Sequence, residues 1–291
     1  MKRKRIVGAV LAALLAAALI ALGTRGTAQR GQSGTVQLDK VAENVYMLTG
    51  RGGNIGLSVG DSGAFLIDDQ FAPMTEPILA AVKSVTDKPV EFVFNTHHHG
   101  DHTGGNENMA KAGAHIVSHV NVRKRLAQSG SSGLPVLTFE DAAVFHWNGD
   151  EVRVFHAPNA HTDGDMMVHF KKANVLHMGD TFFSGRYPYI DINSGGSIDG
   201  LIAAVDSAFK IVNEETQLIP GHGPLSTLSD LKEYREMLIT SRQRVLKLIE
   251  KGKTREEAVA AKPNADMDEQ WGGGFISAER WVGSLYDSLT R

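Results

Sequence analysis

Histidine and aspartate residues cluster in segment 96–102, which reads Thr-His-His-His-Gly-Asp-His and follows an apolar run rich in β-forming residues. Alternate residues of an extended segment point to the same side, so His97 and His99 can close on one metal ion. Asp101 and His102 follow a glycine that lets the chain turn, and they can reach a second ion. Each predicted site still lacks ligands, because zinc typically takes about four.

The missing ligands are predicted downstream, at His161, Asp180 and His222. We expect each of these residues where a strand ends and a loop begins, the place where rigid scaffolds commonly present chemical groups. Two groups of three ligands result: His97, His99 and His161, then Asp101, His102 and His222. Asp180 is left to bridge two ions about 3.5 to 4 Å apart, as two-metal hydrolytic sites require.

The chain contains no cysteine, so thiolate ligands are excluded. Imidazole and carboxylate suit zinc, but they also accept iron or manganese. We expect two zinc ions per chain. The other seven of the 12 histidines lack such motifs and are interpreted as structural, although His98 is placed to tune a ligand: His98, His115, His119, His146, His156, His169 and His177.

The elements that must position these residues are predicted from hydrophobic periodicity and turn signals. Strands are expected at 45–49, 55–59, 64–67, 91–95, 115–118, 143–147, 151–156, 166–170, 175–177 and 216–219. Helices are expected at 74–85, 106–112, 119–128, 197–212 and 228–251. The pattern predicts two halves, each with strands followed by helices.

These motifs resemble those of the metallo-β-lactamase fold superfamily of zinc hydrolases, and the resemblance extends from Thr35 to about Pro224. It implies an α/β fold, a four-layer αββα sandwich with the metals at one edge between the two sheets. The family's ligands fall on the seven residues named above. Gly179-Asp180-Thr181 looks like the bridging aspartate of glyoxalase II and lactonase members, where several β-lactamases of the family have a cysteine.

The resemblance and the ligand count together predict a hydrolase that opens a carbonyl substrate with a metal-bridging hydroxide. Asp101 is the expected catalytic residue, since it would ligate one ion while orienting the hydroxide. We expect a β-lactamase-like activity, measurable on a chromogenic cephalosporin, with lactonase or glyoxalase II-like thioesterase activity as the alternative. An iron-dependent oxidoreductase on the same fold would use much the same ligands and is a further alternative. A non-catalytic metal-binding or interaction protein is the last alternative, but it would have little reason to retain every ligand.

The segment from Phe182 to Ser197 directly follows the predicted bridge and is expected to bind substrate through Arg186, Tyr187 and Asn193. Arg186 would suit a carboxylate through bidentate contact. The alternative is a structural loop held by its aromatic residues. Two further features stay open: a flap or a simple hairpin turn at residues 52–54, and a lid or a buried anchor at Trp271.

The N-terminus is typical of a signal peptide: basic residues 2–5, an apolar run 6–22 and small residues to Ala28. We therefore divide the chain into a signal peptide (1–28), a linker (29–34) and a hydrolase domain (35–291), and expect a periplasmic or secreted protein. An uncleaved membrane anchor is the alternative, because spanning takes about 17 residues or more. The net charge of -3 disfavours nucleic acid, which leaves a small-molecule substrate as the expected partner.

Overall fold

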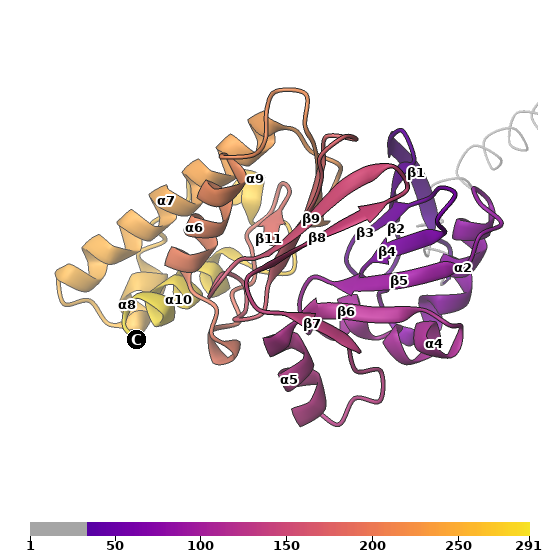
Figure 1. Cartoon of the computed structure of the whole chain (residues 1–291). Coiled ribbons are helices and arrows are strands. Elements are labelled where there is room, and N and C mark those ends of the chain that lie inside the picture. The colour runs from indigo at the N-terminus through magenta and orange to yellow at the C-terminus, as the bar shows by residue number, and fades with distance from the viewer. Residues whose placement is uncertain (1–33) are drawn as a thin grey trace, which may run out of the picture. The chain divides into compact units, whose positions relative to one another are not determined.

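Two β-sheets lie face to face, and helices cover the outer face of each sheet (Figure 1). The computed structural model describes residues 34–291, so the predicted signal peptide and nearly all of the predicted linker lie outside the described residues. The predicted αββα sandwich is confirmed. Within the described residues, no helix is long and apolar enough to cross a membrane.

The first sheet has seven strands in sequence order, antiparallel from β1 to β4 and parallel from β4 to β7. Its strands are β1 (Gln37–Ala42), β2 (Val45–Thr49), β3 (Ile55–Ser58), β4 (Ala64–Ile67), β5 (Val90–Asn95), β6 (His115–His119) and β7 (Leu137–Phe139). The parallel part matters for the site, because the carboxyl ends of β4 and β5 meet at the same edge.

The second sheet has five strands in the order β12-β11-β10-β9-β8, antiparallel except for the parallel pair β11 and β12. Its strands are β8 (Ala142–Trp147), β9 (Asp150–His156), β10 (Met166–Phe170), β11 (Val175–Phe183) and β12 (Gln217–His222). Parallel pairing brings the ends of β11 and β12, and with them two predicted ligands, side by side.

The helices connect the strands or follow them. In the first half they are η1 (Ala72–Met74), α2 (Thr75–Lys83), α3 (Gly100–Thr103), α4 (Asn106–Lys111) and α5 (Val120–Gln128). In the second half they are η2 (Ile192–Ser194), α6 (Ile198–Ala208), α7 (Leu228–Glu250), α8 (Arg255–Ala260), α9 (Asp268–Trp271) and α10 (Ala278–Leu289). Figure 1 shows α2, α4 and α5 beside the first sheet and α6, α7 and α10 beside the second.

Three apolar cores hold the four layers together, one between the sheets and one under each helical layer. Strand β4 shows how the sequence builds them, because every residue of this strand is buried. Phe65 and Ile67 face the second sheet, whereas Ala64 and Leu66 face α2. A strand buried on both faces reads as a continuous apolar run, because alternate side chains enter different cores.

The observed elements differ from the predicted ones at three places near the site. Residues 100–103 form the short helix α3, not a loop. Strand β11 continues beyond His177 to Phe183, so Asp180 lies inside a strand. Strand β12 continues to His222. The apolar pattern of β11 breaks at Gly179, whose positive φ of 51° goes with a register shift, and the strand resumes beyond it.

Candidate metal centre

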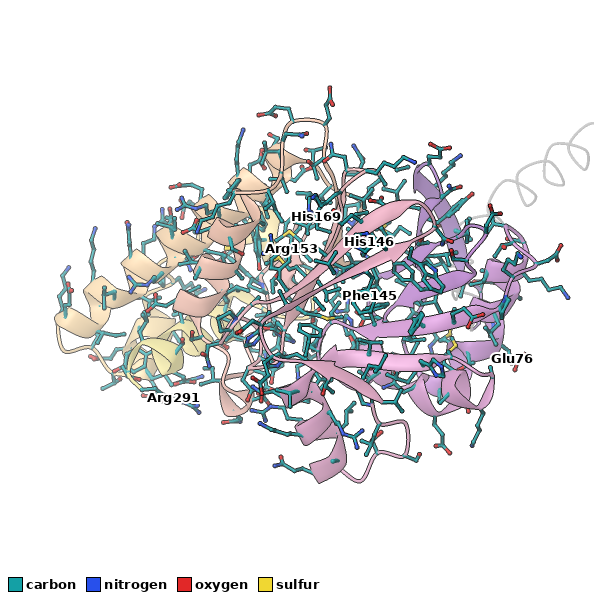
Figure 2. All side chains as sticks on the ribbon, viewed as in Figure 1. Glu76, Phe145, His146, Arg153, His169 and Arg291 are labelled. Atoms are coloured by element: carbon teal, nitrogen blue, oxygen red, sulfur yellow. The ribbon has the colours of Figure 1, made fainter. Side chains whose placement is uncertain are left out.

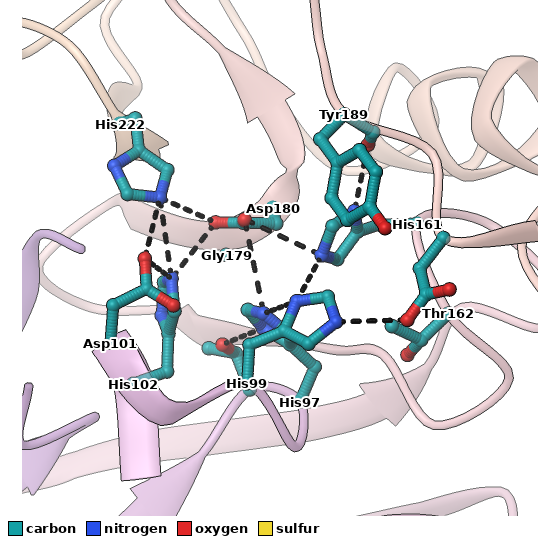
Figure 3. A network of polar contacts seen from close by, with 12 residues as sticks. His97, His99, Asp101, His102, His161, Thr162, Gly179, Asp180, Tyr189 and His222 are labelled. Carbon is teal, nitrogen blue, oxygen red and sulfur yellow. Dashed lines mark hydrogen bonds and ion pairs between the residues drawn. The ribbon is translucent and has the colours of Figure 1, made fainter. Parts of the chain in front are cut away.

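Three histidines and one carboxylate oxygen form the first ligand group (Figure 3). His97 and His99 follow β5, His161 lies between β9 and β10, and Asp180 lies within β11. His99 Nδ1 lies 3.1 Å from His97 Nε2 and 2.9 Å from His161 Nε2. Asp180 Oδ2 lies 3.8 Å from His97 Nε2 and 3.5 Å from His161 Nε2. The four ligand atoms all lie within 4.8 Å of one another, so one metal ion could bind all four.

The second ligand group lies beside the first and consists of Asp101, His102 and His222. Asp101 Oδ2 lies 3.3 Å from His222 Nε2 and 3.6 Å from His102 Nε2. The other oxygen of Asp180, Oδ1, lies 3.2 Å from His102 Nε2 and 3.5 Å from His222 Nε2. Each oxygen of Asp180 therefore faces one group, the position that a bridging carboxylate occupies (Figure 3).

Close packing at the second group requires glycine at two positions. A Cβ atom on Gly221 would lie 2.0 Å from Asp180 Oδ1, and a Cβ atom on Gly53 would lie 2.1 Å from the His102 ring. Gly53 N also donates to the Asp101 carbonyl at 3.0 Å. Asn54 ties the same turn to β12, because its Nδ2 donates to the Pro220 carbonyl at 2.9 Å. The turn at residues 52–54 is thus a fixed wall of the second group.

Four of the five histidines have their remaining ring nitrogen held by a partner. His102 Nδ1 contacts Asp68 Oδ2 at 2.7 Å, and His99 Nε2 contacts Asp191 Oδ2 at 3.0 Å. His161 Nδ1 lies 2.8 Å from the Tyr189 carbonyl oxygen. His97 Nδ1 lies 3.0 Å from the Thr96 hydroxyl. Such contacts fix the ring orientation and leave the inward nitrogen free to ligate.

Burial and the charge of Asp180 set the ionisation of the candidate ligands. Burial lowers the pKa of His161 to about 4 and the pKa of His97 well below its usual value, so both rings are neutral, the form that ligates metal. Burial alone would raise the pKa of Asp180, but His102 and His222 hold it well below its usual value. Against the effect of burial, Asp180 raises the pKa of His222 to about 9 and that of His102 well above its usual value.

The donor atoms fit two metal ions. Ligand atoms about 2.0 to 2.2 Å from a tetrahedral zinc stand roughly 3.3 to 3.6 Å apart, and the separations here run from 2.9 to 3.8 Å. Asp180 Oδ1 is buried and accepts no well-aligned hydrogen bond within residues 34–291, because its polar neighbours are the two ligand nitrogens His102 Nε2 and His222 Nε2. A buried carboxylate oxygen without a partner costs free energy unless a cation satisfies it. The residues present therefore suit a pair of divalent ions.

The predicted substrate-binding residues divide into two sets. Arg186 and Tyr187 line a cavity of about 520 Å³ that opens onto the centre, together with Tyr189 and Phe275. Asn193 does not line this cavity. Its Oδ1 accepts a hydrogen bond from Arg291 Nη2 at 3.1 Å, so the asparagine is used to attach the C-terminal end of the chain (Figure 2 labels Arg291).

Of the two alternatives for Trp271 the structure favours the buried anchor, and His146 and His169 lie outside the groups of possible metal ligands. Trp271 is buried, and its carbonyl accepts a hydrogen bond from Tyr187 N at 2.8 Å. His146 and His169 lie on β8 and β10 of the five-stranded sheet and belong to neither ligand group (Figure 2). His98 contacts Ser194 Oγ at 3.4 Å through Nε2, beside the first group.

Two carboxylates that position ligands escaped sequence reasoning. Asp68 comes directly after β4 with a φ of 67°, and it accepts hydrogen bonds from Thr96 N and Thr96 Oγ1 at 2.7 Å each. Asp191 caps η2, where its Oδ1 accepts from Ser194 N at 3.1 Å. One sequence feature could have indicated Asp68. It is a polar residue that directly follows the buried strand β4, and β4 precedes β5, the strand that leads into the histidine motif.

We expect the variants Asp68→Asn and Asp191→Asn to weaken different metal ions. Asp68→Asn should lower the affinity of the second ion about 10- to 100-fold, because an amide orients the His102 ring less strongly. Asp191→Asn should do the same for the first ion through His99. Titration with a chromophoric chelator resolves the two steps, and each variant serves as the control of the other. Equal weakening of both ions by both variants would contradict these assignments.

Comparison with known proteins gives one family throughout. A model of the Metallo-beta-lactamase superfamily matches residues 38–222. The hydroxyacylglutathione hydrolase of Pelagibacter ubique is 27% identical over 173 residues, which cover 56% of this chain and 66% of that protein. The hydroxyacylglutathione hydrolase of Rhodospirillum rubrum is 36% identical over 112 residues, covering 38% and 41%. The chain thus spans between 41% and 66% of the length of these two relatives.

Solved structures share the fold. A metallo-beta-lactamase from Pontibacter korlensis superimposes with a TM-score of 0.64 at 20% identity, covering 70% of this chain and 99% of that chain. The DIM-1 metallo-beta-lactamase superimposes with a TM-score of 0.63 at 19% identity, covering 71% and 98%. At these identities the likeness concerns the arrangement of sheets and helices alone.

Proposed function

This chain belongs to the metallo-beta-lactamase superfamily, and we propose that it is a two-metal hydrolase that opens activated carbonyl compounds. The observation that carries the proposal is Asp180, whose two oxygens face two separate ligand groups. When bound there, a pair of ions such as zinc would lower the pKa of an attacking water and polarise the carbonyl group. Iron or manganese would fit the same donors.

The chain's own residues supply orientation. Asp101 lines the cavity and is 29% exposed, so its carboxylate can accept a hydrogen bond from the attacking water. Tyr189 also lines the cavity, with its ring 5.9 Å from the His99 ring and 5.7 Å from the His161 ring. Its hydroxyl has no hydrogen-bond partner within residues 34–291, and burial raises its pKa. The hydroxyl is therefore available to donate to the substrate's carbonyl oxygen.

Thioesters and lactones are the first proposed substrates. Two relatives bear the name hydroxyacylglutathione hydrolase, and the bridging ligand here is an aspartate, not a cysteine. β-Lactams are the second candidate, because they carry one carboxylate and Arg186 offers the cavity one cation. An iron-dependent oxidoreductase is the remaining alternative, and metal analysis separates it from a zinc hydrolase.

We expect the purified, zinc-loaded protein to hydrolyse thioesters or lactones with kcat/KM about a hundredfold above that for a chromogenic cephalosporin. Specificity is a ratio of these constants, and a hundredfold ratio corresponds to about 2.7 kcal/mol. The measurement uses one preparation with an aryl thioester, an acylglutathione, a lactone and the cephalosporin. A hundredfold preference for the cephalosporin would replace this proposal with a β-lactamase, and no turnover of any substrate would overturn the hydrolase.

We also propose export, on the basic, apolar and small-residue pattern of residues 1–28. Cells that express the full chain should release a protein that begins at Gln29 into the periplasm or medium. Fractionation followed by N-terminal mass spectrometry measures this directly. Recovery of the intact N-terminus in the membrane fraction would favour the anchor, and recovery in the cytoplasm would contradict both.

A further inference from the structure

The cavity beside the metal centre has two chemically different sides. Ligands of both groups form one side, through His99, Asp101, Asp180 and His222. The other side is built mainly from aromatic and aliphatic side chains. The whole cavity has a volume of about 520 Å³, within the range of small-molecule sites. Within the described residues that line it, Arg186 is the one lysine or arginine. On this side of the cavity, a ligand meets one cationic side chain in largely apolar surroundings.

Arg186 has no hydrogen bond or ion pair with any described residue, a state it shares among the described arginines only with Arg51 and Arg153, neither of which lines the cavity. Five other arginines pair with an aspartate: Arg125, Arg235, Arg242, Arg244 and Arg255. Arg186 is also partly buried, and the loop at Gly274 packs on its stem, where a Cβ atom would come within 3.0 Å of Arg186 Cβ. A partly buried guanidinium without a partner is suited to bind an anionic group of a ligand.

Phe275 is the most exposed large hydrophobic residue in the described part of the chain, at 76%. Two buried residues hold the loop that carries Phe275: Trp271, four positions before it, and Ile276, directly after it. Arg280 places its guanidinium 4.8 Å from the Phe275 ring centre and donates from Nη1 to the Phe275 carbonyl at 3.3 Å. The ring is thus displayed at the cavity by an anchored loop, although leaving it in water forgoes the free energy of apolar burial.

We propose, on the basis of the hydrolase function above, that Arg186 and Phe275 select carbonyl substrates that carry one carboxylate and one flat apolar group. Arg186 would bind the carboxylate, and Phe275 would cover the apolar group together with Tyr189 and Ile276. This class differs from glutathione conjugates, which bring two carboxylates and an ammonium group. The acidic side chains that line the cavity, Asp101 and Asp180, belong to the metal-binding groups and leave no carboxylate for that ammonium.

The segment that carries Phe275 and Ile276, on the apolar side of the cavity, lies outside the part of the chain that matches the superfamily model. That match ends at His222, whereas Phe275 and Ile276 follow α9 and precede α10. Helix α10 packs on α6, α7 and α8, so the loop that carries Phe275 is attached to the second sheet's helical layer. The contribution of Phe275 to the proposed selectivity is therefore a property of this chain's C-terminal segment, whereas Arg186 lies within the part that matches the superfamily model.

The test uses four thioesters of adipic acid: the S-phenyl and S-methyl monothioesters, each as the free acid and as the methyl ester. We expect the wild type to prefer the S-phenyl free acid. Arg186→Gln should lower kcat/KM for the free acid about twentyfold more than for its methyl ester, the size of a charge-assisted hydrogen bond. Phe275→Ala should lower the S-phenyl preference about tenfold, and Phe275→Tyr should retain it. Arg153→Gln, on β9 away from the cavity, is the matched control (Figure 2).

Binding of 3-phenylpropionate to the zinc-loaded protein, measured by calorimetry, separates this inference from the hydrolase proposal. Loss of binding in Arg186→Gln without turnover of any thioester would sink thioester hydrolysis and leave the ligand class standing. The proposed ligand class would be overturned if kcat/KM were the same for free acids and methyl esters and for S-phenyl and S-methyl thioesters. It would also be overturned if Arg186→Gln bound 3-phenylpropionate as tightly as the wild type does. Preference for acylglutathione over the S-phenyl free acid would also contradict it.

Discussion

The variant Asp180→Asn is expected to lower kcat about a thousandfold and to reduce the bound metal from two ions toward one. Asparagine has the shape of aspartate, but its amide nitrogen cannot ligate a cation, so one of the two groups loses its shared oxygen. A thousandfold change in rate corresponds to about 4 kcal/mol. Elemental analysis of the purified variant and steady-state kinetics on the best thioester or lactone measure both effects.

The control for Asp180→Asn is Asp61→Asn, which makes the same chemical change at an exposed carboxylate. We expect this control to keep two ions and the wild-type rate. The folded state of both variants is compared by circular dichroism, because burial of the Asp180 side chain makes a folding defect the competing explanation. Two tightly bound ions and an undiminished rate in the folded Asp180→Asn protein would show that the bridge is misassigned.

The seven candidate ligands were predicted from their motifs, whereas the sandwich was implied by the resemblance to a known family. The motif at residues 96–102 places four candidate ligands within seven consecutive residues. Histidines and aspartates at such spacing are typical of a metal site. The strands that carry them are buried on both faces and read as apolar runs. Structure then brings all seven side chains into two adjoining groups, with Asp180 between them.

The residues that support the ligands could not be found in this way. Asp68 and Asp191 act through single contacts with His102 and His99, 34 and 92 residues away. A single aspartate has no spacing that marks its role, and only the parallel pairing of β4 with β5 brings Asp68 to Thr96. Phe275 was missed for a similar reason, because the fold alone shows that its loop lies at the cavity.

The extent of β11 shows a limit of periodicity. An apolar pattern predicts a strand that ends at His177, since glycine and aspartate follow. The strand continues because Gly179 adopts a positive φ beside Thr96, which shifts the register and turns Asp180 toward the ligands. Sequence rules that consider only neighbouring residues predict that a strand ends at such a glycine. Here the glycine lies at a bulge within β11, and the bulge orients the side chain of Asp180.

Removal of the metal is expected to abolish hydrolysis and to destabilise the fold. Protein from a zinc- and iron-balanced medium should contain about two zinc ions per chain, and dialysis against a chelator should remove both. Without the ions, the buried carboxylate of Asp180 keeps an oxygen that accepts no well-aligned hydrogen bond and has only the His102 and His222 rings beside it. Activity should return on addition of about two equivalents of zinc, and one tightly bound iron with no zinc would favour the oxidoreductase instead.

The destabilisation has a predictable size and a control. Each ion present at about a thousand times its Kd stabilises the folded state by about 4 kcal/mol, so removal of both should cost about 8 kcal/mol and, in a domain of this size, lower Tm by roughly 20 °C. In the Asp180→Asn variant the same chelation should shift Tm by less, because one ion is already lost. An unchanged Tm after chelation of the wild type would mean that the two groups of histidines and aspartates keep their positions without cations. That result would contradict the assignment of these groups as metal sites.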